Sequence, residues 1–259
     1  MTSTGPQYIQ SRDNALLKDL RRLAQDNNAY RKQGRVWLEG DHLCRAALQR
    51  GSRPAMAVFQ ASCWAATSAQ WPDDIGRVVV VEDALFDGIS SLESPARMAF
   101  VLPLPQAVAV QPGVPSVVLD GLQDAGNVGA ILRSAAAFGF RQVLAMRGTA
   151  ALWSPKVLRA GMGAHFGLHL VEAIEPATLD LLRVPIVATS SHAGEWLHRT
   201  VLPWPCAWAL GHEGQGLGDE IASRAGVAVR IVQPGGEESL NVAAAAAICL
   251  HASAAAQAG

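Results

Sequence analysis

Long apolar runs and paired cysteine motifs are both missing from this 259-residue sequence. No stretch of about 20 uninterrupted apolar residues occurs, so we predict no transmembrane helix. The N-terminal residues also lack the basic-then-apolar layout of a signal peptide. The cysteines form no CxxC pair, which argues against a disulfide framework or a zinc cluster and favours a reducing, cytoplasmic location. We expect small buried hydrophobes at all four: Cys44, Cys63, Cys206 and Cys249.

The motifs of several common enzyme classes are missing as well. No GxxxxGK[ST] sequence occurs, so an ATP phosphate loop is not supported. The glycines of residues 211–218 follow the order GxxGxGxG, which is a poor match to the dinucleotide fingerprint GxGxxG. GxSxG, the serine-hydrolase elbow, is absent. The seven histidines assemble into no ligand cluster, and we therefore expect no metal.

Charged residues are few, at 17%, whereas half of the chain is apolar, so composition excludes wholesale disorder. The net charge of −1 hides an asymmetry, because residues 1–53 hold 10 Lys+Arg against 5 Asp+Glu. A basic end on a near-neutral protein points weakly to a polyanionic partner. On charge alone, a solvated helix face around Lys18, Arg21 and Arg22 is the simpler explanation.

A proline-rich stretch marks the clearest domain boundary. Four prolines between residues 102 and 115 forbid a continuous helix and favour extended backbone. We therefore expect a domain over residues 1–103, a linker over 104–115 and a second domain over 116–259. The elements predicted in the first domain are helices at 14–26 and 41–49 and strands at 35–39, 55–59 and 77–82.

The second domain alternates short apolar strands with helical segments. This alternation predicts an α/β fold with a mostly parallel sheet that is covered on both faces. The predicted strands are 116–120, 142–146, 185–189, 206–211 and 227–232, and the predicted helices are 127–138 and the Ala-rich 239–256.

The first loop that could carry chemistry spans residues 120–133, after a predicted strand. Ligands of open α/β sheets bind at the carboxyl ends of strands. Asn127 is expected at the helix start, where Asn is an ordinary cap. Arg133 lies within an otherwise apolar helix, so its guanidinium is either a surface group or a buried group that requires partners.

Two further loops follow predicted strands. Residues 210–218 contain four glycines, which let backbone approach a ligand closely, and a single acid, Glu213. Residues 231–242 enter the last helix, where a capping role explains Ser239 but not Asn241, a poor helix former among alanines. A plain Gly-rich turn remains an alternative for each. Together the loops suggest an adenosine-like ligand held mainly by backbone.

These loops resemble the three motifs of the SpoU (TrmH-type) RNA ribose 2′-O-methyltransferases of the SPOUT class. DAGNVGAILRSAAAFGF resembles the first motif, ALGHEGQGLGDEI the second and IVQPGGEESLNVAAAAAI the third. WSPKVLRAGMGAHF is similar to a further family segment, and residues 31–51 resemble the substrate-binding domain of many members. The chain departs from the family pattern at Ala125, at Gly161 and at residues 232–234, where the family commonly continues its Ile with Pro-Met.

The resemblance implies an α/β fold whose C-terminal segment forms a trefoil knot, preceded by a small αβ RNA-binding domain. It also implies S-adenosylmethionine as co-substrate, a homodimer, and methylation of a ribose 2′-hydroxyl in RNA. Ribosomal RNA is the preferred substrate because of the N-terminal domain, and tRNA is the alternative. Two other interpretations stay open: a catalytically silent RNA-binding relative, and an oxidoreductase that binds its nucleotide at residues 211–218.

The resemblance also assigns the site. Arg133 would clamp a phosphate and stabilise the developing alkoxide, and Glu213 would fix the loops or pair with Arg133. The residues expected to orient Arg133 and the ribose are Asn127, Ser239 and Asn241. The residues expected to wrap the co-substrate are Leu210, Gly211, Gly216, Ile231 and Leu240.

Overall fold

The protein forms two compact units. The computed structural model describes residues 5–72, 75–90, 92–106, 108–190, 194–235 and 239–258. Unit 1 contains Met1–Gln106 together with Trp153–Phe166, and unit 2 contains Ala107–Leu152 and Gly167–Gly259. The segment Trp153–Phe166, expected within the second domain, therefore belongs to unit 1 by its contacts. None of the helices among the described residues is long and apolar enough to cross a membrane.

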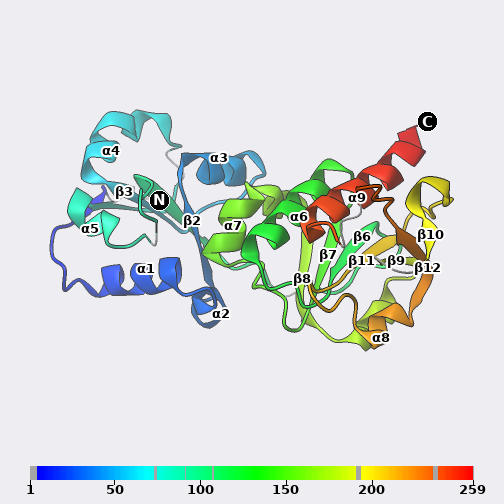
Figure 1. Ribbon diagram of the computed structural model, residues 1–259. Helices are drawn as coiled ribbons and strands as arrows, with labels where there is room; N and C mark the ends of the chain where they lie inside the picture. Colours follow the sequence, from blue (N-terminus) through cyan, green and yellow to red (C-terminus); the bar gives the residue numbers. More distant parts are fainter. Residues whose placement is uncertain are drawn as a thin grey trace. The chain divides into compact units, whose positions relative to one another are not determined.

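Unit 1 is built on a five-stranded sheet with the order β1-β4-β3-β5-β2. Its strands are β1 (Gln7–Ile9), β2 (Arg35–Glu39), β3 (Met56–Gln60), β4 (Arg77–Val81) and β5 (Met98–Pro103). Strands β1, β4 and β3 run parallel, whereas β5 is antiparallel to both of its neighbours. Helices cover both faces (Figure 1): α1 (Ala15–Gln25), α2 (Ala29–Gln33), α3 (Asp41–Gln49), α4 (Ala61–Thr67) and α5 (Asp83–Asp87).

Helix α1 shows why the basic residues of unit 1 face solvent. The Asn14 side chain accepts the Leu16 N–H at 2.9 Å and begins the helix. Leucines at helical spacing, Leu17, Leu20 and Leu23, are buried. The residues between them, Lys18, Arg21 and Arg22, are consequently exposed.

Helix α7 (Pro155–Gly161) completes unit 1 by packing against β2. Ser154 caps it, with the Val157 N–H donating to Ser154 Oγ at 3.3 Å. The chain then turns sharply at Gly163, which has φ +90°. A Cβ on Gly163 would lie 2.7 Å from Cβ of Ala46 in α3, so only glycine permits this close approach.

Unit 2 is a seven-stranded sheet with the order β10-β12-β9-β11-β6-β7-β8. Every pairing between its named strands is parallel, which confirms the predicted α/β class; the trefoil knot stays a prediction. The strands are β6 (Ser116–Leu119), β7 (Gln142–Met146), β8 (His169–Ile174), β9 (Ile186–Thr189), β10 (Glu195–Trp196), β11 (Ala207–Leu210) and β12 (Ala225–Arg230).

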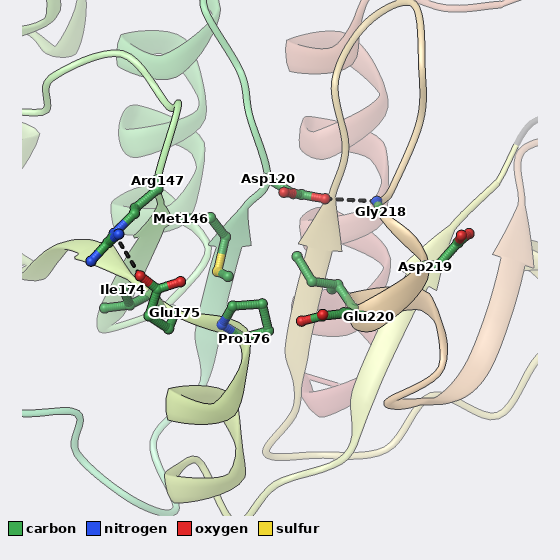
Figure 2. Close-up of a pocket in the computed structure, with 10 residues that line it drawn as sticks. Asp120, Met146, Arg147, Ile174, Glu175, Pro176, Gly218, Asp219 and Glu220 are labelled. Carbon is green, nitrogen blue, oxygen red and sulfur yellow. Dashed lines mark hydrogen bonds and ion pairs between the residues drawn. The ribbon is translucent and has the colours of Figure 1, made fainter.

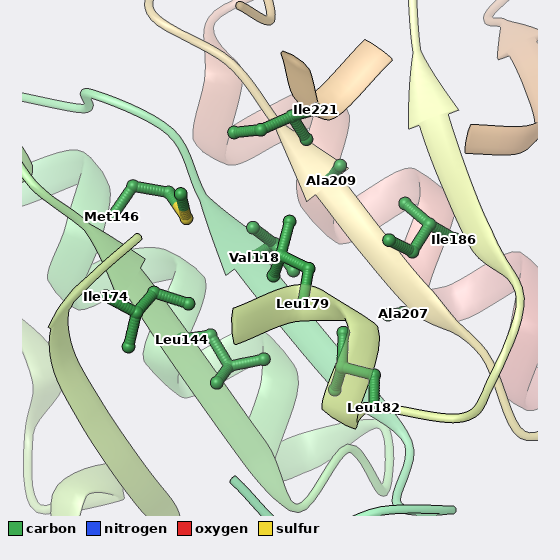
Figure 3. Close-up of a cluster of buried hydrophobic side chains, with 10 residues drawn as sticks. All are labelled: Val118, Leu144, Met146, Ile174, Leu179, Leu182, Ile186, Ala207, Ala209 and Ile221. Atoms are coloured by element: carbon green, nitrogen blue, oxygen red, sulfur yellow. The ribbon is translucent and has the colours of Figure 1, made fainter. Parts of the chain in front are cut away.

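One face of this sheet carries a buried apolar cluster (Figure 3). Alternate residues of the strands point into it, for example Ala207 and Ala209 of β11. The short segments η3 (Pro176–Leu181) and α8 (Asp219–Ala222) add Leu179 and Ile221 to the same cluster. Small and branched side chains allow these short segments to lie close to the strands.

Helices α6 (Ala125–Ala137) and α9 (Val242–Ala258) pack against one another, and α9 packs on β11 (Figure 1). Trp208 of β11 is fully buried, and its indole N–H donates to Ser253 Oγ of α9 at 2.9 Å.

Two buried cysteines lie in the same elements or next to them. Burial raises the pKa of the Cys206 thiol to about 11 and that of Cys249 to about 12. These thiols are therefore protonated at neutral pH and unsuited to nucleophilic catalysis.

Candidate functional site

The strand order of unit 2 reverses between β6 and β11. From β6 the chain proceeds through β7 to β8 on one side, and it then builds β9, β11 and β12 on the other. The carboxyl ends of all these strands lie at one edge, because the sheet is parallel. The three predicted loops leave β6, β11 and β12 at this edge, where open α/β sheets bind ligands.

One side chain from each loop joins a hydrogen-bonded chain. Asn127 Nδ2 donates to Glu213 Oε1 at 3.0 Å, and Asn241 Nδ2 donates to Asn127 Oδ1 at 3.0 Å. A carboxylate only accepts, so Glu213 fixes which end of the Asn127 amide faces it. That choice in turn requires Asn241 to present its NH₂ group to Asn127. The chain thus ties together loops that lie 86 and 114 residues apart in the sequence.

The caps of the two helices differ from the prediction. Helix α6 is capped by Asp124, whose Oδ1 accepts the Asn127 N–H at 2.7 Å, so Asn127 lies in the first turn and not at the cap. Helix α9 is capped by Asn241, whose Oδ1 accepts the Ala243 and Ala244 N–H groups at 2.9 and 3.2 Å. Asn241, and not Ser239, is therefore the cap. Capping explains why an asparagine stands at position 241.

The glycine loop after β11 closes on itself. The N–H of His212 donates to the Gly216 carbonyl at 2.9 Å, and the N–H of Gly216 donates back at 2.8 Å. A Cβ on Gly211 would lie 2.2 Å from the Gly216 carbonyl carbon, and Gly216 itself has φ +72°. Both glycines are thus required by the turn, which holds Glu213 at its tip.

Asp120 anchors the far end of this loop, a contact that sequence analysis missed. Its Oδ2 accepts the Gly218 N–H at 2.8 Å (Figure 2). Asp120 and Gly218 also border a hollow of about 260 Å³, on whose other side Arg147 and Glu175 form an ion pair at 2.6 Å. The available signal was the position of Asp120, the first polar residue after a buried strand.

Arg133 is exposed on α6 and is not part of the hydrogen-bonded chain from Glu213 through Asn127 to Asn241. Within the described residues it forms no hydrogen bond or ion pair. Glu213 is hydrogen-bonded to Asn127, and no ion pair joins it to Arg133 in the part of the chain that the structure describes. Ser239 is also exposed.

The five residues expected around the co-substrate all lie at the same sheet edge. Leu210 is buried, and its carbonyl accepts the Asp120 N–H at 2.9 Å. Ile231 is half-buried, and Leu240 is 39% exposed. Gly211 and Gly216 form the turn already described. The neighbouring residues 236–238 fall outside the described part of the chain.

An adenosine-like group fits this edge. Gln233 Oε1 is buried and has no hydrogen-bond partner within the described residues, and Val232 next to it is 51% exposed. Exposed apolar side chains beside an unsatisfied buried acceptor suit an aromatic heterocycle with a polar rim. Among the described residues, no group of three or more His, Cys, Asp or Glu side chains is arranged to hold a metal ion.

Comparisons with known families agree with this geometry. The profile of the SpoU rRNA Methylase family matches residues 115–251. The profile of the MRM3-like substrate binding domain matches residues 14–99. The first match contains all three loops, and the second spans most of unit 1.

Similar proteins include enzymes named for ribosomal RNA. The chain is 28% identical over 251 residues to the Bacillus subtilis 23S rRNA (guanosine(2553)-2′-O)-methyltransferase RlmP, covering 94% of this chain and 97% of that protein. It is 35% identical over 159 residues to the human mitochondrial rRNA methyltransferase 3, covering 57% of this chain but only 37% of the human protein. The AdoMet-bound rRNA methyltransferase of Sinorhizobium meliloti superposes with a TM-score of 0.83 at 28% identity, covering 97% of this chain and 98% of that one.

Proposed function

Because the chain belongs to the SpoU rRNA Methylase family, we propose that it transfers a methyl group from S-adenosylmethionine to a ribose 2′-hydroxyl of RNA. The family resemblance inferred from the three motifs is thereby confirmed. Ribosomal RNA is the proposed substrate, since the similar proteins described above are named for it. Transfer RNA is the second candidate.

The hydrogen-bonded chain from Glu213 through Asn127 to Asn241 carries the proposal. It holds the three loops of the family at the one sheet edge where a ligand fits. A nucleotide-dependent oxidoreductase has less support, because the turn at Gly211 and Gly216 is closed on itself.

Positioning is the main demand of this reaction. S-adenosylmethionine, when bound, supplies a methyl group activated by a sulfonium sulfur. The ribose oxygen must line up with that carbon and sulfur, and it loses its proton as the O–C bond forms and the C–S bond breaks. We assign the orienting role to Asn127, Ser239 and Asn241, and the fixing of the loops to Glu213.

Arg133 is the proposed catalytic residue. Its guanidinium is always charged, so it is a poor proton acceptor. It is exposed and unpaired within the described residues. It is therefore available to clamp the RNA phosphate next to the reacting ribose and to stabilise the alkoxide that develops on the ribose oxygen. The proton then passes to that phosphate or to water.

The co-substrate would be held mainly by backbone. Leu210, Gly211 and Gly216 would contribute from the loop after β11, and Ile231 and Leu240 from the segment after β12. Of these side chains, Leu240 is the most exposed apolar one. It is therefore the one that most needs a ligand or partner to cover it.

RNA would be gripped by residues 1–103, linked by residues 104–115 to the methyltransferase domain over 116–259, from which Trp153–Phe166 depart to join unit 1. The support is the basic excess of residues 1–53 and the exposure of Lys18, Arg21 and Arg22 on α1. The match to an MRM3-like substrate binding domain agrees with this role.

A homodimer in the cytoplasm is the proposed working state. Helix α9 is apolar, and Ile248 on it is 42% exposed, so a second copy would cover this face. Four free cysteines suit a reducing compartment.

The proposal is tested by methylation of RNA from a strain that lacks the gene, followed by mapping of the new 2′-O-methyl sites. Arg133→Lys and Arg133→Ala should each lose on the order of 10²–10³ in single-turnover rate. Calorimetric binding of S-adenosylhomocysteine should be unchanged. Arg141→Ala, at another exposed arginine of unit 2, is the matched control.

Each outcome has a distinct meaning. Near-normal turnover in Arg133→Ala would remove Arg133 from the catalytic role, and lost S-adenosylhomocysteine binding would make its role structural. Binding of S-adenosylhomocysteine by the wild type without any methylation would favour the catalytically silent relative.

A further inference from the structure

Gln233 places a buried amide oxygen at the carboxyl end of β12 without a donor to satisfy it. Within the described residues, Oε1 of Gln233 has no hydrogen-bond partner. A carbonyl held away from water without a donor costs free energy, and most such groups in folded proteins are satisfied. Such an atom is explained where a ligand or an ordered water supplies the missing donor.

The sheet places Gln233 near the glycine loop. Strand β12 pairs with β9, and β9 pairs with β11, so the carboxyl ends of all three lie at one edge. Gln233 follows the end of β12 by three residues, and Gly211 directly follows β11. Strands β12 and β11 are two spacings apart, roughly 10 Å, a distance that an adenosine can span.

The neighbours of Gln233 narrow the chemistry of the ligand. Val232 and Leu240 are apolar yet 51% and 39% exposed, and Ile231 is half-buried. Apolar side chains would cover the faces of a flat heterocycle, and the unsatisfied acceptor would meet a donor on its rim. Adenine has both features, because its 6-amino group donates and its ring faces are apolar.

We propose that the side-chain amide oxygen of Gln233 accepts a hydrogen bond from the 6-amino group of the adenine of the methyl donor, and so strengthens binding of the co-substrate. The inference rests on the proposed function, because it requires S-adenosylmethionine at this edge. Gln233 is then a binding residue that never touches the transferred methyl group. It also stands in residues 232–234, where the chain departs from the family pattern.

The test compares two ligands that differ at one position of the base. Calorimetry on the full chain at about pH 8 would measure dissociation constants for S-adenosylhomocysteine and for S-inosylhomocysteine, in which a 6-oxo acceptor replaces the 6-amino donor. Gln233→Met keeps the length of the side chain and removes the amide. Gln233→Glu keeps only acceptors. Gln257→Met, at an exposed glutamine of α9, is the matched control, and circular dichroism checks that each variant folds.

The two Gln233 variants should change ligand binding in different ways. Loss of one buried hydrogen bond should weaken binding of S-adenosylhomocysteine about 3–10-fold in Gln233→Met. In Gln233→Glu the preference for adenine over hypoxanthine should rise, because a carboxylate only accepts and repels the 6-oxo group, whereas an amide can turn its nitrogen toward that group. The control should leave both the affinity and the preference unchanged.

Two results would overturn the inference alone. They are an unchanged affinity for S-adenosylhomocysteine in Gln233→Met, as expected if only water satisfies the amide, and a preference for adenine that falls or stays the same in Gln233→Glu. Should Gln233→Met not fold, the result for Gln233→Glu alone decides. Failure of the wild-type protein to bind S-adenosylhomocysteine would instead defeat the proposed function itself.

Discussion

The Asn241 amide forms hydrogen bonds through both its oxygen and its nitrogen, and substitutions can separate the effects of the two. Its oxygen caps α9 through the N–H groups of Ala243 and Ala244, and its nitrogen donates to Asn127. Asn241→Ala removes both functions. Asn241→Asp keeps an oxygen for the cap, where a negative charge is also favoured, but it has no donor for Asn127.

The expected magnitudes follow from these contacts. Loss of a cap costs about 1 kcal/mol, and an exposed hydrogen bond contributes about 0.5 kcal/mol, so Asn241→Ala should lose about 1.5 kcal/mol of unfolding free energy. That loss corresponds to a fall in Tm of about 3–6 °C for a protein of this size. Asn241→Asp should stay within about 0.5 kcal/mol of wild type, because the cap survives.

The two Asn241 variants should differ in stability but lose methylation activity to a similar extent. In Asn241→Asp, two acceptors face one another at Asn127, and turning that amide would only move the conflict to Glu213. Both variants should therefore lose the link between the loops and show similarly reduced single-turnover methylation.

Thermal unfolding followed by far-ultraviolet circular dichroism, together with the methylation assay, measures the two effects. Asn27→Asp, at an exposed asparagine of unit 1, is the control. The reasoning fails if Asn241→Asp is as destabilised as Asn241→Ala, or if it methylates RNA like wild type.

Two further predictions concern stability and reactivity. Gly163→Ala should lose about 1–3 kcal/mol more than Gly148→Ala, because both have a similar positive φ but only Gly163 leaves no room for a Cβ; urea unfolding measures the difference, and equal losses would contradict it. Iodoacetamide should alkylate Cys63 first at neutral pH, since the other three thiols are buried with raised pKa values. Peptide mass spectrometry would detect the order, and early labelling of Cys249 would refute it.

Elements with continuous apolar runs were predictable from the sequence. Strands β2 and β7 occupy residues 35–39 and 142–146 as predicted, because buried strands need little besides such a run and its flanking turns. Strand β5 was missed, since it runs into the proline-rich boundary at Pro103. Strand β8 was missed because His169 and Glu172 interrupt its apolar pattern.

The candidate site was predictable in its parts but not in its connections. Residue types at strand ends indicated which loops matter. No local sequence pattern predicts that the Asn127 amide bonds to residues 213 and 241, because such pairings are set by tertiary structure alone. The same limit explains why Asn241 looked out of place in a helix that it caps.

The position of α7 in the chain has a consequence for the order of events during synthesis. When the ribosome has made Gln106, unit 1 still lacks Trp153–Phe166. Another 60 residues, Ala107 to Phe166, must follow, which takes about 3–12 s at typical rates of translation. During that time β2 lacks the helix that packs on it, while β6, α6 and β7 of unit 2 are already being made. The two units therefore cannot mature one after the other; the first is finished only after the second has begun.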